Sequence, residues 1–429
     1  MNLRLTAALS LALLTACQRE QAVKAPAGPA PGLASTGKSL PAVPPVRVNL
    51  LDAGRGGTVI SRTGEHSLEV SPVLTIDGDR LTLWSTPRDN AEQTIVFALP
   101  ARSLVDEIAV QVGSTEDQYA PRKLALESSL DGVTFTPLIT FTPGLVEPMQ
   151  TRSITPVEMR YLRVKTVGAS RFSQVREFAA HGRELEPPAP GRLEGAWMLN
   201  SSPAHFVTRG ARTFGVLADR EPLYVDGGSD GRAYRFAWSR GPQIGLALVT
   251  VSPDGKHLSG IQWHTEKVSF ENVGRTWFGD RADSNDLKTD GTEVMLAFMR
   301  HTGFYPLYGL YFDEGDGLIE SESDATLAMV QALVTGSAQR RFRLTAVEVR
   351  GDAAGNHARA TKRIGALREV LQRRRLDLSR VSFAIAGAEQ ARVKADTPVE
   401  HALYGVVELQ LEPPQAAPRL VLARCCFRP

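Results

Sequence analysis

Short runs of alternating apolar and polar residues, separated by turn dipeptides, constrain the fold of this chain more than any other feature. Four such runs lie at residues 94–99 (TIVFAL), 107–112 (EIAVQV), 123–128 (KLALES) and 161–167 (YLRVKTV). Turn signals stand between them, among them Asp77-Gly78 and Asp131-Gly132. Short strands with turns at this spacing are typical of antiparallel sheets packed around one core. Residues 47–183 are therefore predicted to form a β-sandwich or barrel.

Length, charge and cysteine content exclude several classes of protein. The chain has 429 residues, which predicts about two to four domains. Its 49 Lys and Arg residues against 47 Asp and Glu give a net charge of +2, so the basic face of a nucleic-acid binder is not expected. Only three cysteines occur, Cys17, Cys425 and Cys426. They are too few for a disulfide framework or a cysteine-rich zinc site.

Residues 1–17 read as an export signal. One positive charge, Arg4, precedes an apolar run at residues 7–14, which is far shorter than the ~20 residues of a membrane-spanning helix. An ordinary buried helix start is the alternative. The run ends in residues 14–17 (LTAC), which resemble the lipobox of bacterial lipoproteins. The resemblance implies that Cys17 is lipidated and anchors the protein to a membrane.

The residues after the lipobox-like motif indicate where the anchored protein resides. Gln18 follows Cys17, and by family analogy a residue other than Asp at this position implies the outer membrane. Residues 18–46 are rich in Pro and Ala and show no apolar period, so they are predicted to be a tether that is partly extended. The folded part is then periplasmic or surface-exposed.

The first folded segment resembles the discoidin (coagulation-factor type C) or galactose-binding-like jelly roll. The matching pieces are residues 74–79 (LTIDGD) with Trp84-Ser85, 129–135 (SLDGVTF), 160–164 (RYLRV) and 175–178 (VREF). The resemblance implies sugar binding through apical loops, sometimes beside a structural calcium ion. Trp84 is more readily a core residue than a sugar platform. Asp77 and Asp79 could hold a cation, but a satisfied turn is the simpler interpretation, so no metal site is predicted.

A Pro-rich linker at residues 184–190 precedes a second folded segment, residues 191–290. Glycines punctuate short strand-like pieces there, which predicts a small antiparallel β-meander or barrel. The opening Gly195-Ala196-Trp197 resembles that of calycin-type barrels, where the ring closes the base. The tryptophans are predicted to be core, with lipid or small-ligand binding as the alternative. His257 and His264 lack further ligands nearby and are interpreted as surface or packing residues.

The third segment, residues 306–411, is predicted to be a two-layer α/β domain with the order β-α-β-α-β-β. The expected strands are residues 307–312, 341–350, 381–387 and 404–411. The first helix is expected to start at a Ser-x-x-Asp capping box, residues 321–324, and Asn356 is expected to cap the second. Residues 412–429 form a tail.

The third segment resembles the OmpA-like peptidoglycan-binding domain. The matching residues are Phe312-Asp313, Ser323-x-Ala325-x-Leu327, Gly351, Asn356, Lys362-Arg363, Gly387-x-Glu389 and Val407-Glu408. The family holds the zwitterionic diaminopimelate of the peptidoglycan stem peptide. The resemblance implies that Arg363 clamps its carboxylate, that Glu348 or Asp352 receives its ammonium, and that Asn356 belongs to the same site. Glu348 stands where the family has Asp.

No catalytic motif stands out, since nucleophile-elbow, zincin and Walker patterns are all missing from the sequence. The chain is therefore predicted to be non-catalytic and to need no cofactor. The leading hypothesis is a lipid-anchored cell-envelope protein that binds peptidoglycan through its C-terminal domain. The alternative is a carbohydrate-capture or adhesion lipoprotein that acts through the discoidin-like domain on a glycan.

Overall fold

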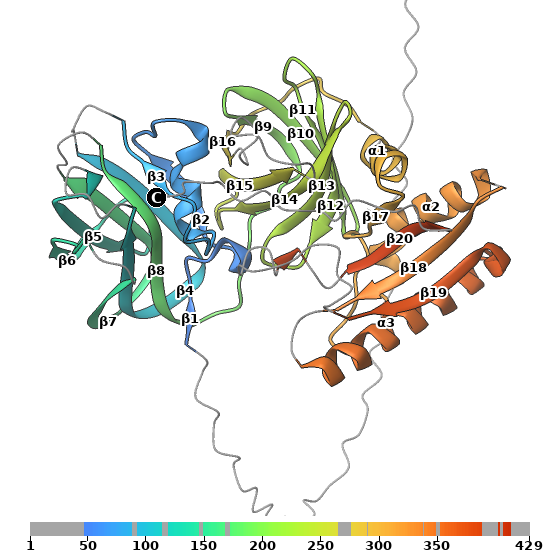
Figure 1. The fold of residues 1–429 in the computed structure, drawn as a ribbon. Coiled ribbons are helices and arrows are strands. Elements are labelled where there is room, and N and C mark those ends of the chain that lie inside the picture. Colours follow the sequence, from blue (N-terminus) through green and yellow to red (C-terminus); the bar gives the residue numbers. More distant parts are fainter. Residues whose placement is uncertain are drawn as a thin grey trace, which may run out of the picture. The chain divides into compact units, whose positions relative to one another are not determined.

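The computed structural model forms a β-sandwich, a closed β-barrel and an α/β region (Figure 1). It describes residues 47–87, 92–113, 119–145, 149–167, 172–264, 276–289, 291–337, 339–348, 352–387, 402–403 and 406–412. The predicted signal peptide, Cys17, the tether and the tail after Glu412 lie outside these residues. Within the described part of the chain, no helix has the length and apolar character to cross a membrane.

The sandwich is built from eight strands whose sheet runs in the order β1-β8-β4-β7-β5-β6, with β2 paired to β4 and β3 to β8. The strands are β1 (Val48–Asn49), β2 (Thr58–Arg62), β3 (Trp84–Ser85), β4 (Gln93–Val112), β5 (Lys123–Ser129), β6 (Thr136–Phe141), β7 (Gln150–Val167) and β8 (Gln174–Glu184). Short 3-10 helices lie among them: η1 (Ala53–Arg55), η2 (Leu68–Val70) and η3 (Pro72–Ile76). All the pairings are antiparallel, which confirms the predicted sandwich for residues 47–183.

Strand β4 shows where the alternating pattern misleads. Residues 94–99 and 107–112 read as two strands but both lie in β4, which is 20 residues long. The pairing register of β4 with β7 shifts between Ala98 and Ser103 and again between Val105 and Glu107. Bulges of this kind let one strand bend from one packed layer to the other without a turn. The polar residues between the two runs mark bends within a strand, not a loop.

Trp84 is part of the sandwich core, as predicted. Its side chain is completely buried. The indole Nε1 donates a hydrogen bond to the backbone oxygen of Gly64 at 3.1 Å. A buried indole needs such an acceptor, because an unpaired N–H in the core is costly. The ring is therefore unavailable as a sugar platform.

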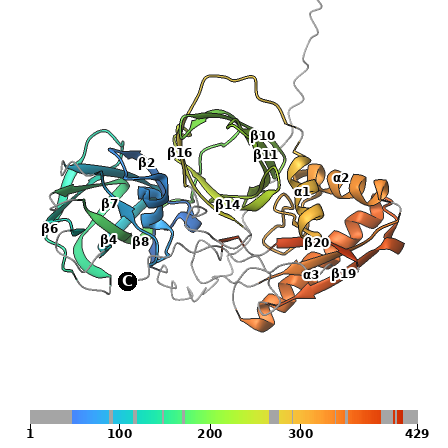
Figure 2. The same cartoon turned by 45° about the horizontal axis from the view of Figure 1, so that its top comes forward.

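The second segment is a closed barrel in which each strand pairs with its neighbours in sequence, which confirms the barrel prediction (Figure 2). The strands are β9 (Gly195–Leu199), β10 (Ser202–Arg209), β11 (Arg212–Leu217), β12 (Leu223–Ser229), β13 (Tyr234–Arg240), β14 (Gln243–Val251), β15 (His257–His264) and β16 (Thr276–Arg281). A barrel of about eight strands is just wide enough for side chains to fill. Sixteen buried residues form its inner cluster, including Trp197, Trp238 and Trp277, which favours a packed interior over a ligand-binding lumen.

Trp197 is buried in the inner cluster, next to the place where the first and last strands of the barrel pair. Its Nε1 donates to the backbone oxygen of Leu193 at 2.7 Å. The Arg281 guanidinium from the last strand lies 4.4 Å from the centre of its ring. Arg281 also donates to the backbone oxygens of Glu194 and Gly255, each at 2.7 Å. The first and last strands are thus tied together at the point where the barrel closes.

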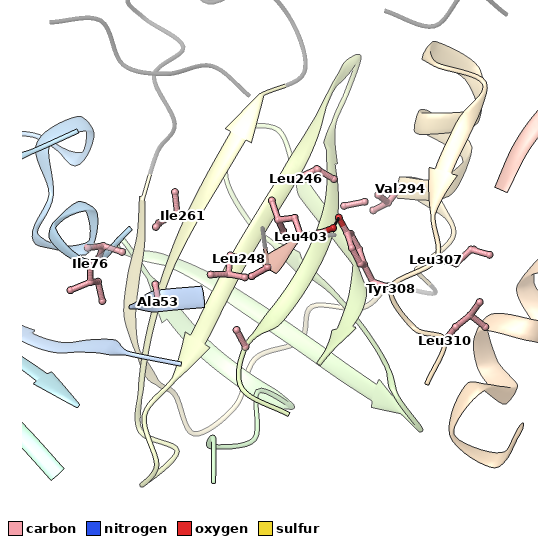
Figure 3. Packing of buried hydrophobic residues seen from close by; sticks show 14 of the residues in the cluster. Ala53, Ile76, Leu246, Leu248, Ile261, Val294, Leu307, Tyr308, Leu310 and Leu403 are labelled. Atoms are coloured by element: carbon pink, nitrogen blue, oxygen red, sulfur yellow. Dashed lines mark hydrogen bonds between the residues drawn. The ribbon is translucent and has the colours of Figure 1, made fainter. Parts of the chain in front are cut away.

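Strand β14 explains why one core extends beyond the barrel. Its residues alternate between the inner cluster, which takes Ala247 and Val249, and an outer cluster, which takes Leu246 and Leu248. The outer cluster also contains Ala53 and Ile76 of the sandwich and Val294 and Tyr308 of the C-terminal region (Figure 3). A strand buried on both faces reads as a continuous apolar run, which is the pattern that β14 shows.

Residues 184–190, predicted as a linker, are held against strand β4. The amide of Leu185 donates to the backbone oxygen of Arg102 at 2.9 Å, and the amide of Ala189 donates to that of Pro100 at 3.2 Å. Because the outer cluster joins residues from before and after this segment, the Pro-rich composition does not mark a break in packing.

The C-terminal region contains a four-stranded sheet in the order β17-β20-β18-β19, in which β18 and β19 are parallel. Its elements are α1 (Glu293–His301), β17 (Phe304–Pro306), α2 (Glu320–Gly336), β18 (Arg341–Val347), α3 (Ala353–Arg373), η6 (Leu378–Arg380), β19 (Val381–Ala386) and β20 (Val406–Glu412). The predicted order of strands and helices is confirmed from β17 onward, and α1 is an addition that was not predicted.

The first predicted strand of this region is wrong in position. Residues 307–312 form turns and an isolated bridge, and the strand is the shorter β17 before them. Leu307, Tyr308 and Leu310 are buried in the outer cluster that β14 shares. Their apolar pattern reflects packing in that cluster and not a place in the sheet.

Both predicted helix caps are also wrong. Helix α2 begins at Glu320 without a side-chain cap, and Ser323 instead accepts a hydrogen bond from the amide of Tyr311 at 2.9 Å. Helix α3 is capped by Asp352, whose carboxylate accepts from the amide of Gly355 at 2.7 Å. Asn356 lies inside α3. An Asp that directly precedes the helix satisfies its free amides, so Asn356 is not needed as a cap.

Candidate functional site

Three aromatic rings from three loops stack at one end of the sandwich. They are His66 after β2, Tyr119 before β5 and Phe172 before β8. The Phe172 ring lies 5.0 Å from that of Tyr119 and 5.9 Å from that of His66, centre to centre, and both pairs are stacked. Phe172 is therefore the middle ring, and the outer faces of Tyr119 and His66 are those that a ligand can approach.

The stack lies at the protein surface. His66 is exposed, and Tyr119 and Phe172 are half-buried. Aromatic side chains have an apolar face and lose little conformational entropy on binding, so a rigid exposed stack is suited to the apolar face of a sugar ring. No local sequence pattern groups these three residues, because they are more than 50 positions apart. What they share in the sequence is that each lies in a loop next to a strand of the sandwich.

The sandwich also contains a buried carboxylate pair. Asp77 follows η3, and Glu177 lies in β8, five residues after Phe172. Both are almost fully buried, with exposed fractions of 4% and 3%. Both carboxylate oxygens of Asp77 lie 2.9 to 3.0 Å from the Thr82 hydroxyl. Glu177 Oε1 accepts from the amide of Gly78 at 3.3 Å.

Glu177 is not satisfied by these contacts. Its Oε2 is buried and has no hydrogen-bond partner among the described residues, and the same holds for Oε1 of Gln111, its register partner in β4. Burial raises the pKa of Glu177 well above its usual range, and the negative charge of Asp77 raises it further. Two close buried carboxylates without a cation beside them are expensive, because each raises the energy of the other's charged form.

The donor set fits a hard cation such as Ca²⁺. Asp77, Glu177 and the Thr82 hydroxyl offer oxygen ligands, and the uncommitted Glu177 Oε2 supplies the orphaned acceptor that a cation would satisfy. In the part of the chain that the structure describes, no group of three or more His, Cys, Asp or Glu side chains is arranged around a metal position. A site here would therefore depend on two carboxylates supplemented by neutral oxygens. Asp77 also forms the satisfied turn expected from the sequence, since its Oδ1 accepts from the amide of Asp79 at 2.9 Å.

A separate groove of about 810 Å³ runs along the sandwich between β6 and β7. Hydroxyl side chains and aliphatic residues line it, among them Ser129, Leu138 and Ile154, and none of its lining residues is aromatic. Leu130 and Val133 stand exposed at the turn beside it. The groove lacks both the stacked rings and the carboxylate pair.

The structure brings Glu348 and Arg363 together, but as partners of each other. Arg363 Nη1 donates to Glu348 Oε2 at 2.8 Å, and its Nε donates to Asp316 Oδ1 at 2.8 Å. Its guanidinium also lies 5.2 Å from the centre of the Phe312 ring. Glu348 is 3% exposed and Asp316 8% exposed. The resemblance assigns the Arg363 guanidinium to a ligand carboxylate, but in the structure it already pairs with two carboxylates of the protein itself.

The other two residues of the predicted peptidoglycan site act within the helix. Asp352 caps α3 through the amide of Gly355. Asn356 Oδ1 accepts from Arg359 Nη2 at 2.5 Å, and Arg359 Nε in turn lies 3.9 Å from Glu348 Oε2. The structure therefore links Asn356 to the Glu348–Arg363 pair, whereas Asp352 serves as the N-cap. His257, which the sequence analysis interprets as a surface or packing residue, pairs through its Nδ1 with Asp280 Oδ1 at 2.7 Å.

No curated protein is significantly similar in sequence to this chain. Residues 58–178 match the family described as the F5/8 type C domain. The matched span starts at the first residue of β2 and ends within β8, so it takes in Asp77, Trp84 and the three stacked rings.

Several solved structures align with about a third of this chain. The family 32 CBM from C. perfringens NanJ, in complex with galactose, is 18% identical, covers 32% of this chain and 99% of its own, and has a TM-score of 0.29. The C-terminal domain of a chitobiase from Bacteroides fragilis is 16% identical, with 31% and 98% covered and a TM-score of 0.29. Chitosan-binding module 1 from a Paenibacillus sp. IK-5 chitosanase/glucanase is 19% identical, with 30% and 98% covered and a TM-score of 0.27.

The assignment of the sandwich rests on the family match together with the observed strands, since these TM-scores are all below 0.5. The match and the antiparallel topology agree with the resemblance found in the sequence. Residues 58–178 are an F5/8 type C domain of the discoidin-like type.

Proposed function

We propose that this protein is a non-catalytic glycan-binding protein that acts through the loops around Phe172 in its F5/8 type C domain. The observation that carries the proposal is the surface stack of Tyr119, Phe172 and His66. The buried carboxylate pair of Asp77 and Glu177, once neutralised by a cation, would fix the loops that hold the stack. The family match supports the same reading, because it places this chemistry in a domain type whose members include sugar-binding modules.

Peptidoglycan binding through Arg363 is less well supported than glycan binding. A diaminopimelate carboxylate would compete with Glu348 and Asp316 for Arg363, and displacing the buried Glu348 would be costly. Leaving a buried carboxylate without its partner costs several kcal/mol, about 3–5 kcal/mol where the pair is fully buried. A ligand would have to offset that cost before it gained any affinity. Anchoring of the protein in the outer membrane through a lipidated Cys17 stays a prediction within this proposal.

The proposal is tested by offering the chain from Gln18 to Pro429 a panel of immobilised ligands. The panel holds galactose-terminated glycans, N-acetylgalactosamine-terminated glycans, chitosan and isolated peptidoglycan sacculi. We expect retention on at least one of the glycans, with release by the corresponding free sugar. Retention on sacculi alone would favour the OmpA-like reading, and retention on nothing would leave the stack without a ligand and contradict the proposal.

A further inference from the structure

The loop that carries His66 is contacted at both ends by the barrel. This loop, residues 63–67, connects β2 to η2 in the sandwich. At its start, the Arg62 guanidinium lies 3.9 Å from the centre of the Phe278 ring in β16. At its end, the Thr276 hydroxyl of β16 donates to the backbone oxygen of Leu68 at 3.0 Å. A single barrel strand therefore contacts both flanks of one sandwich loop.

The contact at Arg62 is rigid because the side chain is fixed twice. Its Nε and Nη2 pair with Glu65 at 2.6 and 2.8 Å, and only 14% of the Arg62 side chain and 11% of the Glu65 side chain are exposed. Glu65 directly precedes His66. A guanidinium that stacks on a ring and makes a two-point ion pair holds its partner in one orientation. Phe278 thus fixes Arg62, and Arg62 fixes the residue next to His66.

The contact at Leu68 is partly buried. Thr276 itself is completely buried, and loss of its hydroxyl would leave the Leu68 backbone oxygen without that donor. Within the sandwich, the loop is held by the His66 amide, which donates to Ser85 O at 2.8 Å, and by Trp84 Nε1, which donates to Gly64 O at 3.1 Å. Both the sandwich and the barrel therefore hold this loop in its conformation.

We propose that Phe278 and Thr276 are positioning residues for the glycan-binding loops: strand β16 of the barrel holds residues 63–67 so that His66 completes the stack on Phe172. This inference rests on the proposed function of the stack. It gives the barrel a role that its filled interior does not, namely to pre-organise a binding loop of another domain. Pre-organisation raises affinity by reducing the entropy that the loop loses when ligand binds.

The test compares variants of the chain from Gln18 to Pro429. Phe278→Ala and Thr276→Val remove the two contacts, and Phe278→Tyr and Thr276→Ser are the conservative variants that keep them. Arg232→Gln is the matched control. It breaks another ion pair between barrel and sandwich, since Arg232 pairs with Glu184 at 2.5 and 2.9 Å, but Glu184 ends β8 and lies ten residues along the strand from Gln174.

Two readouts separate this inference from the proposed function. Hydrogen exchange of a peptide covering residues 63–67, measured without ligand, should be at least tenfold faster in Phe278→Ala combined with Thr276→Val. It should stay within twofold of the wild type in Arg232→Gln and in the conservative variants. Affinity for the retained glycan should fall at least fivefold in the combined variant, but not in Arg232→Gln, Phe278→Tyr or Thr276→Ser.

The possible results are distinct. Unchanged exchange in the combined variant would overturn the inference, because the sandwich alone would then hold the loop. Equal exchange and affinity losses in Arg232→Gln would also overturn it, since any damage to the shared core would have the same effect. A wild-type chain that binds no glycan, but whose loop exchanges faster in the combined variant, would contradict the proposed function and uphold the positioning role.

Discussion

Arg363→Ala is expected to destabilise the C-terminal region by about 3 kcal/mol, because it leaves the buried carboxylate of Glu348 without its main partner. Asp316 loses the same guanidinium. Circular dichroism at 222 nm follows the unfolding of this region, since all the α-helices of the described residues lie between Glu293 and Arg373. Tryptophan fluorescence follows the rest, because every tryptophan precedes residue 278. The helical transition should shift to lower urea concentration and the fluorescence transition much less.

Arg373→Ala is the control for Arg363→Ala. Arg373 pairs with Glu320 at 3.1 Å, but its side chain is 60% exposed, and exposed pairs contribute at most about 1 kcal/mol. If Arg363→Ala left the helical transition unchanged and abolished retention on sacculi, Arg363 would be a ligand clamp, as the OmpA-like resemblance implies. A loss of stability without any binding to sacculi in the wild type would identify a structural ion pair.

Calcium is expected to stabilise the sandwich, and Glu177→Gln is expected to remove that effect. A ligand at 100 times its dissociation constant adds about 2.7 kcal/mol to the stability of the state it binds. Glu177 contributes the uncommitted buried oxygen, so its neutral analogue should bind the ion poorly. Trp84 is buried in the same domain, which makes tryptophan fluorescence a suitable probe of unfolding.

Which of the two proteins is the more stable, wild type or Glu177→Gln, should differ between EDTA and calcium. In EDTA, Glu177→Gln should be at least as stable as the wild type, because the substitution removes a buried carboxyl group whose pKa is raised by burial and by Asp77, that is, whose ionisation both oppose. In calcium the wild type should be the more stable of the two. Magnesium should stabilise less, since it demands a tighter octahedral arrangement of ligands. A wild-type chain that is indifferent to calcium would show that Asp77 forms only the satisfied turn expected from the sequence.

The strands and the barrel were predictable because side chains of a strand that are buried on one face recur at every second residue of the sequence. Period-two alternation located β5 and parts of β4 and β7, and glycine-punctuated hairpins identified the barrel. The alternating pattern gave wrong strand bounds where the burial of side chains does not follow the pairing of strands. In β4 a bulge keeps one strand continuous through a change of face. Residues 307–312 are apolar because they pack in a shared core and not because they belong to a sheet.

The candidate site was predictable only in part, for reasons of geometry. Asp77 was visible because it lies in a turn motif, but its partner Glu177 is 100 residues away and becomes a neighbour only because η3 packs against β8. The three stacked rings come from loops whose spacing follows no local rule. Resemblance did identify Glu348 and Arg363 as neighbours, yet it could not show that Asp316 also accepts a hydrogen bond from Arg363, at Nε.

The most direct test of the central claim is the affinity of the chain for the glycan that it retains, measured by calorimetric titration in wild type and Tyr119→Ala. Tyr119 has an outer face that a sugar can approach, and loss of a stacking aromatic typically costs ~1–3 kcal/mol where a planar ligand is held in this way. Tyr311→Ala, which removes another partly exposed tyrosine outside the sandwich, is the matched control. We predict at least a fivefold weaker affinity for Tyr119→Ala and an unchanged one for Tyr311→Ala. Equal affinities in all three proteins would contradict the claim that this protein binds glycans through the stack of His66, Phe172 and Tyr119.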